Sequence, residues 1–168
     1  LLANGRSGVT LRRGTAQARA FAAMLRAVTR TLARLIVEDG EGATRTMEVC
    51  VVGARTEAEA QACARSVARS SLVKTMLSGG DPNVGRIAAA AGASAARYDP
   101  DRLDIHIGPQ PVVSRGVALR VGKAAARELL NRPHVTVRIA LHAGRASGRM
   151  LTCDLTERYV HINARYST

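Results

Sequence analysis

An acidic turn between two glycines, residues 39–44, is the feature that most constrains how this chain can fold. The segment reads D-G-E-G-A-T and separates a long amphipathic stretch from a run of β-branched and apolar residues. The simplest interpretation is a helix end, with Gly40 in the left-handed conformation and Glu41 in solvent. The alternative is functional, because flanking glycines let the backbone turn sharply and let another molecule approach a carboxylate that can bind a cation. Both interpretations predict a helix, a turn and a strand in that order.

The stretch before the turn predicts one long helix, with Thr15 as its N-cap and an end near Val37. Its large apolar residues recur at helical spacing, so we expect them to form one buried stripe. They are Phe21, Met24, Leu25, Val28, Leu32, Leu35 and Ile36. The arginines off that stripe (19, 26, 30 and 34) are most simply a solvated face, and the sharper alternative is a phosphate-binding ridge.

The rest of the chain alternates between strand and helix signals. Residues 46–52 predict a strand buried on both faces, and Thr56 with Glu59 forms a capping box that opens a helix running towards Lys74. Further helices are expected at 83–91, with Asp81 as N-cap, and at 122–131. Further strands are expected at 103–107, 112–113, 135–141 and 149–155. We expect the last of these strands to form a hairpin with the strand at 135–141. Residues 1–5 read as the end of a strand that began upstream, and the C-terminal run most simply as a terminal strand. The order predicts an α+β fold of mixed α/β layers, one compact unit over 1–168 with lobes at 1–95 and 96–168.

The charge balance invites a nucleic-acid interpretation but supports it weakly. The 168 residues carry a formal charge of +12, from 25 basic and 13 acidic side chains. The arginines are scattered along the chain, and aromatic residues, which would stack on bases, make up only 2%. A basic nucleic-acid-binding domain therefore stays the third hypothesis, behind an enzyme and a scaffold.

Cofactor and redox chemistry find little support in the sequence. Cys50, Cys63 and Cys153 are odd in number and widely spaced, which indicates reduced thiols in a cytoplasmic protein, with Cys50 and Cys63 in the core. The four histidines do not have the spacing of a metal site, and no phosphate loop, dinucleotide fingerprint or Ser-His-Asp pattern is present. No apolar run approaches the roughly 20 residues that span a membrane. We expect no metal, no cofactor and no membrane association.

Three separated segments together resemble a known family. They are D-G-E-G-A-T at 39–44, S-L-V-K-T at 71–75 with G-D-P-N-V-G-R at 80–86, and T-C-D-L-T-E-R-Y-V-H-I-N-A-R-Y-S-T at 152–168. In this order they resemble the ornithine acetyltransferase (glutamate N-acetyltransferase) family, the ArgJ-type enzymes of arginine biosynthesis. The family patterns are D-G-E-G-A-T, S-P-L-V-K-T, D-P-N-W-G-R and C-D-L-T-x-x-Y-V-x-I-N-A-x-Y-T-T. The resemblance spans the whole chain and implies the layered sheet-and-helix fold of this family.

The resemblance implies an acyltransferase that is made as a self-cleaving precursor. Cleavage frees a threonine at the start of the β chain, and this nucleophile carries acetyl from N-acetylornithine to glutamate in a ping-pong reaction, while the oxyanion donors lie in the α chain. This chain resembles the later part of the β chain, so no catalytic residue is expected within it. The implied partners are the α chain of the same precursor and a second αβ unit in a heterotetramer, with acetyl-CoA as a further substrate of bifunctional members.

The resemblance also carries substrate-binding roles onto Glu41, Asn163 and Thr168. A carboxylate can neutralise the ammonium of ornithine, and an amide and a hydroxyl can hold the polar groups of an amino acid. The Lys74 segment and the Asp81–Arg86 segment match the family too, but capping and packing explain them. Ser71 stands for the usual proline, Val84 for tryptophan, Arg45 for lysine and Arg165 for an acidic residue. These departures leave open a divergent paralogue with altered substrate preference, or a non-catalytic scaffold.

Overall fold

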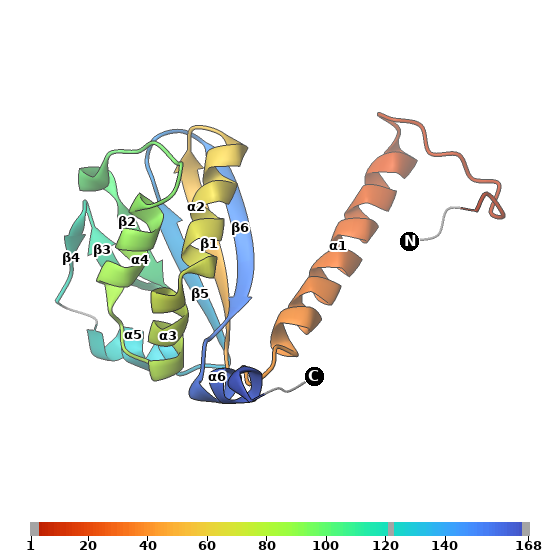
Figure 1. Cartoon of the computed structure of the whole chain (residues 1–168). Helices are drawn as coiled ribbons and strands as arrows, with labels where there is room; N and C mark the ends of the chain where they lie inside the picture. Colours follow the sequence, from red (N-terminus) through yellow and green to blue (C-terminus); the bar gives the residue numbers. More distant parts are fainter. Residues whose placement is uncertain (1–3, 121–122, 166–168) are drawn as a thin grey trace. The chain divides into compact units, whose positions relative to one another are not determined.

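The computed structural model describes residues 4–120 and 123–165. They form six α-helices, one short 3-10 helix and a six-stranded sheet of order β4-β3-β2-β5-β1-β6 (Figure 1). The chain divides into two compact units, one ending at Leu35 and the other beginning at Ile36. Helices layered on a mixed sheet confirm the predicted α+β class. The strand end expected at residues 1–5 falls mostly outside the described residues.

Helix α1 (Ala16–Glu38) makes up most of the first unit. Thr15 caps it as predicted, because its Oγ1 accepts from the backbone N of Ala18 at 3.2 Å. The first unit by itself does not bury the predicted stripe: no residue of α1 is buried, and Met24 is 68% exposed. Helical periodicity shows which face of a helix is apolar but does not provide the element that covers it. Among the described residues, no helix has the length and apolarity needed to cross a membrane.

The second unit is built around β1 (Thr46–Ala54), which lies between β5 and β6. The other strands are β2 (Asp104–Ile107), β3 (Gln110–Ser114), β4 (Val117–Ala118), β5 (His134–Ala140) and β6 (Ala146–Cys153). β1 runs parallel to β5 and antiparallel to β6, and β5 pairs on its other side with β2. Strands from both sides of residue 95 therefore interleave in one sheet.

The prediction that β6 forms a hairpin with β5 is wrong. β6 begins at Ala146 and pairs with β1 instead, with Glu48 opposite Leu151. The connection after β5 crosses the end of β1, where the backbone N atoms of Ala143 and Gly144 both donate to Gly53 O, at 2.7 and 2.8 Å. A Cβ at Gly144 would collide with the carbonyl oxygen of Ala54, so glycine is needed for this close crossing.

Helices α2 (Glu57–Arg69), α3 (Ser71–Gly79) and α4 (Val84–Gly92) form a layer on one face of the sheet (Figure 1). Beneath them, Met47, Val49 and Val51 of β1 are fully buried. The predicted single helix towards Lys74 is wrong, because Ser70 is extended (φ −66°, ψ 116°) and caps α3 by accepting from the backbone N of Val73 at 3.4 Å.

The other face of β1 departs from the prediction of burial on both sides. Glu48, Cys50 and Val52 are only half-buried, so β1 has one core face and one partly open face. Burial nevertheless raises the pKa of the Cys50 thiol, and the nearby Glu48 charge raises it further. Cys63 is fully buried, as expected.

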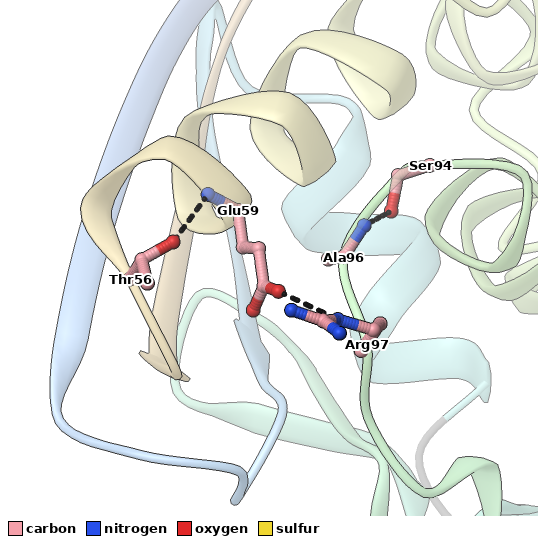
Figure 2. Close-up of polar contacts among 5 residues, drawn as sticks. All are labelled: Thr56, Glu59, Ser94, Ala96 and Arg97. Carbon is pink, nitrogen blue, oxygen red and sulfur yellow. Dashed lines mark hydrogen bonds and ion pairs between the residues drawn. The ribbon is translucent and has the colours of Figure 1, made fainter.

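The capping box at the start of α2 is formed in part. Thr56 Oγ1 accepts from the backbone N of Glu59 at 3.1 Å (Figure 2). The Glu59 carboxylate does not close the box, since its Oε1 accepts from Arg97 Nε at 3.2 Å. The glutamate therefore ties α2 to the segment that follows α4.

The remaining elements complete the second unit. The 3-10 helix (Pro100–Arg102) precedes β2, and α5 (Lys123–Leu130) contributes Ala126 and Leu130 to the core. α4 begins at Val84 with Asn83 in the N-cap position, so the expected N-cap at Asp81 is wrong by two residues. Residues 157–164 form helix α6 (Glu157–Ala164) rather than a terminal strand.

Candidate functional site

The turn after α1 places Glu41 at the surface of the second unit. The backbone N of Gly40 donates to Val37 O at 3.3 Å, and that of Ala43 donates to Gly40 O at 2.9 Å. Gly40 was expected to be left-handed, but the positive φ falls on Gly42, at 67°. A Cβ on Gly42 would also lie 2.7 Å from the backbone N of Tyr159, so the residue is glycine for two reasons.

Asp154 locks this turn to the end of β6. Its carboxylate is 3% exposed and accepts from the backbone N of Thr44 at 2.9 Å, from Thr44 Oγ1 at 2.6 Å and from the backbone N of Arg45 at 3.2 Å. The backbone N of Asp154 returns a bond to Arg45 O at 3.0 Å. A buried carboxylate that accepts hydrogen bonds from several donors fixes their relative positions, so Asp154 holds the turn rigidly against the end of β6.

Thr156 attaches helix α6 to the same turn. Its Oγ1 donates to Gly42 O at 2.7 Å and accepts from the backbone N of Tyr159 at 3.2 Å, which makes it the N-cap of α6. One side chain thus starts the helix and holds it against the glycine turn.

Two of the three predicted site residues are brought together by this arrangement. Asn163 Nδ2, near the end of α6, donates to Glu41 Oε2 at 3.0 Å and to Tyr159 O at 3.0 Å. Both side chains are exposed. The third predicted residue, Thr168, lies outside the described residues.

The Glu41 carboxylate keeps its negative charge uncompensated within the described part of the chain. No arginine, lysine or histidine there lies within ion-pairing distance of it, and its one hydrogen bond comes from a neutral amide. Asn163 Oδ1 has no donor among the described residues either. Together they offer three oxygen acceptors, Glu41 Oε1 and Oε2 and Asn163 Oδ1, to a cationic group such as an ammonium.

The other family-like segments have structural roles, as expected. Lys74 O accepts from the backbone N of Leu155 at 3.2 Å. Arg86 Nη1 donates to Leu72 O at 3.0 Å and to Thr75 Oγ1 at 3.1 Å, which joins α4 to α3. No group of acidic, histidine or cysteine side chains that could hold a metal ion occurs in residues 4–120 and 123–165.

Sequence reasoning missed the residues that position the pair. Asp154 and Thr156 were noted only as letters of the C-terminal pattern. A signal was available, since an acid directly after an apolar strand rarely remains buried without several donors. Arg165, one of the departures from the family pattern, follows α6 as its C-cap residue.

Comparisons with known proteins decide the family. The family model described as ArgJ family matches residues 1–168. The chain belongs to the ArgJ family. The resemblance inferred from the motifs is confirmed.

Relatives of the chain carry the ArgJ name. "Arginine biosynthesis bifunctional protein ArgJ, chloroplastic" of Oryza sativa subsp. japonica is 46% identical over 174 residues, which cover 99% of this chain and 38% of that protein. "Arginine biosynthesis bifunctional protein ArgJ" of Thermus thermophilus is 44% identical over 168 residues, covering 100% of this chain and 42% of that protein. The chain thus spans about two fifths of the length of these ArgJ relatives.

A solved structure agrees with the fold. The crystal structure of arginine biosynthesis bifunctional protein ArgJ from Bacillus halodurans matches with a TM-score of 0.92 at 35% identity. The match covers 98% of this chain and 78% of that chain. The layered α+β fold expected of an ArgJ-type chain is therefore confirmed.

Proposed function

We propose that this chain is the later part of the β chain of an acetyltransferase that moves acetyl from N-acetylornithine to glutamate. The observation that carries the proposal is the Glu41–Asn163 pair, whose side chains are exposed and have no cationic partner among the described residues. The names of the ArgJ relatives support a place in arginine biosynthesis. In this proposal the chain forms one wall of the amino-acid site.

The pair suits N-acetylornithine better than glutamate. The α-amine of N-acetylornithine is acylated and neutral, so its only cation is the δ-ammonium, which has three donors for the three acceptor oxygens of the pair. Glutamate would bring a second carboxylate towards Glu41, and like charges repel at such distances. Glu41 should therefore act mainly in the donor half of the reaction.

The chemistry itself is proposed to use a threonine outside these residues. Its Oγ attacks the acetyl carbonyl, the amide C–N bond breaks and ornithine leaves with the proton, which gives an acetyl ester on the threonine. The α-amine of glutamate then attacks the ester, the new C–N bond forms as the Oγ–C bond breaks, and Oγ recovers a proton. The α chain would supply the oxyanion donors, and two αβ units would form the heterotetramer. In bifunctional members acetyl-CoA would serve as a second donor.

The test is a transfer assay on the assembled enzyme, with acetylation of glutamate from N-acetylornithine as the readout. Glu41→Gln removes the charge while it keeps the shape and one acceptor, so we expect a KM for N-acetylornithine raised about tenfold or more. Glu157→Gln, an exposed acid at the start of α6, is the matched control. An assembled protein that never transfers acetyl, or a Glu41→Gln variant that behaves like its control, would contradict the proposal and favour the scaffold hypothesis instead.

The compartment is a separate proposal. Reduced cysteines favour a cytoplasmic location. Relatives from rice are named chloroplastic, so fractionation of the source cells is the measurement that decides between the two.

A further inference from the structure

We propose that α2 and α4 form a binding site for a small phosphate-bearing anion, separate from the Glu41–Asn163 pair. The site is an open, shallow hollow of about 570 Å³ at the surface. Arg65, Ser66, Arg69, Ser70, Ala90 and Ser94 are among the residues that line it. The hollow includes no residue of the Glu41–Asn163 pair, so anion binding there is independent of acetyl transfer.

Two arginines give the hollow its charge. Arg65 and Arg69 are one helical turn apart on α2, so their side chains leave the same face. No residue that lines the hollow is acidic, and neither guanidinium has an ion pair or hydrogen bond among the described residues. Like charges at this spacing destabilise a helix, and an anion between them would remove that repulsion.

Some other surface arginines in this unit have acidic partners. Arg97 Nε lies 3.2 Å from Oε1 of Glu59, which is in the first turn of α2, and Arg149 Nη1 lies 3.4 Å from Glu48 Oε1. Arg65 and Arg69 have no such partner among the described residues, so the positive charge of the hollow is uncompensated there.

The hydrogen-bonding groups of the hollow favour an anion that accepts bonds. Ser70 Oγ accepts from the backbone N of Val73, so its O–H remains free to donate. Ser66 and Ser94 already donate, to Ala90 O and Ala91 O at 2.6 Å each. The Ser66 bond joins α2 to α4, whereas the Ser94 bond closes the last turn of α4. The free donors are therefore the two guanidinium forks and one hydroxyl.

These donors suit a phosphoryl group better than other anions. A guanidinium presents a planar fork that matches two phosphate oxygens, and two forks one turn apart can hold a phosphate or diphosphate between them. A nucleic-acid strand is a poorer occupant, because the hollow is lined by no aromatic residue that could stack on a base. The expected ligand is a free diphosphate or the diphosphate of a small metabolite.

Isothermal titration of the protein with inorganic pyrophosphate tests the site. We expect saturable binding of one equivalent that weakens about fivefold in Arg65→Gln or Arg69→Gln and at least about twentyfold in the double variant. Ser70→Asp should abolish binding by repulsion while it preserves the cap of α3, since aspartate is also a good N-cap. Arg102→Gln, an exposed arginine away from the hollow, is the control, and circular dichroism checks that each variant folds.

Two further ligands show which kind of anion the hollow binds. A nucleoside diphosphate that binds more tightly than pyrophosphate would point to a nucleotide, and equal affinities would point to the diphosphate alone. Succinate, a dicarboxylate, should bind at least about tenfold more weakly than pyrophosphate. No saturable binding of pyrophosphate at about 10 mM, undiminished binding in the double variant, or succinate binding as tight as pyrophosphate would overturn the proposal.

Discussion

Asp154 is the residue whose removal should damage the site most without touching the proposed substrate groups. In Asp154→Ala the backbone N–H groups of Thr44 and Arg45 and the hydroxyl of Thr44 lose their acceptor. A buried donor left without a partner costs about 1–3 kcal/mol. Thr44 is exposed, so water can reach part of this cluster, and the net loss should be about 2–4 kcal/mol. For a protein of this size that corresponds to a Tm about 5–12 °C lower.

The substitution Asp154→Asn separates charge from shape. Asparagine keeps one oxygen for the two backbone donors but places an amide opposite Thr44 Oγ1, whose hydroxyl must rotate to accept. We expect a smaller loss of about 1–2 kcal/mol. Asp101→Ala and Asp101→Asn, at an exposed acid with no side-chain bond among the described residues, are the matched controls.

Urea unfolding gives the free energies, and hydrogen exchange gives the location of the damage. If the Asp154 carboxylate holds the turn, the amides of Thr44 and Arg45 should exchange faster in Asp154→Asn, while those in the middle of β1 stay protected. A Tm for Asp154→Ala within about 2 °C of its Asp101 control would refute the reasoning, because the carboxylate would then contribute no more than a surface charge.

Three further predictions follow from the same unit. Gly42→Ala should lower the free energy of unfolding, measured by thermal unfolding, by at least about 1–2 kcal/mol. Alanine is strained at the positive φ of this residue, and its Cβ would collide with the backbone of α6. An unchanged free energy of unfolding would contradict the turn geometry. Under the proposed function, Glu41→Gln should slow acetylation of the enzyme by N-acetylornithine far more than deacetylation by glutamate, measured in single-turnover half-reactions; equal effects would count against an ammonium site. The Asp104 carboxyl accepts from the backbone N of Arg115 and from His142, and these bonds lower its pKa. The ionised Asp104 carboxylate therefore stabilises the folded protein above its unfolded pKa, near 4, and this stabilisation is lost as the pH falls through the lower folded pKa. In Asp104→Asn, Tm should consequently fall less steeply with decreasing pH, in unfolding curves measured from about pH 6 to 2. An unchanged acid limb would show that the pair contributes nothing.

The local elements could be predicted where one or two side chains decide them. Thr15 and Thr56 each accept the backbone bond expected of an N-cap, and the helices begin next to them. Ser70 shows the limit of such signals, since the sequence on both sides continues the helical pattern and only the ψ of this residue breaks it. A serine can continue a helix or cap the next one, and tertiary packing makes the choice.

Strand partners could not be predicted in the same way. The alternation in β5 and β6 shows that each strand has a buried face, but not which neighbour it pairs with. Proximity in sequence suggested a hairpin, whereas the crossing over Gly53 carries the chain past β1 to its far side. That path depends on glycines that allow close approach, which sequence patterns reveal only as turns.

The candidate site shows why the motifs were informative before their geometry was known. The Glu41–Asn163 bond joins residues 122 positions apart, so only the resemblance to a family could place them together. The local interpretation assigned the left-handed turn to Gly40 as a helix cap, but the strained position is Gly42, and the reason is the backbone of α6. The second glycine is therefore a requirement of the C-terminal segment rather than of the helix before it. The two motifs form one structural unit, so Gly42→Ala and Thr156→Ala should be non-additive in unfolding free energy: once α6 is detached by one change, the other has less to disrupt.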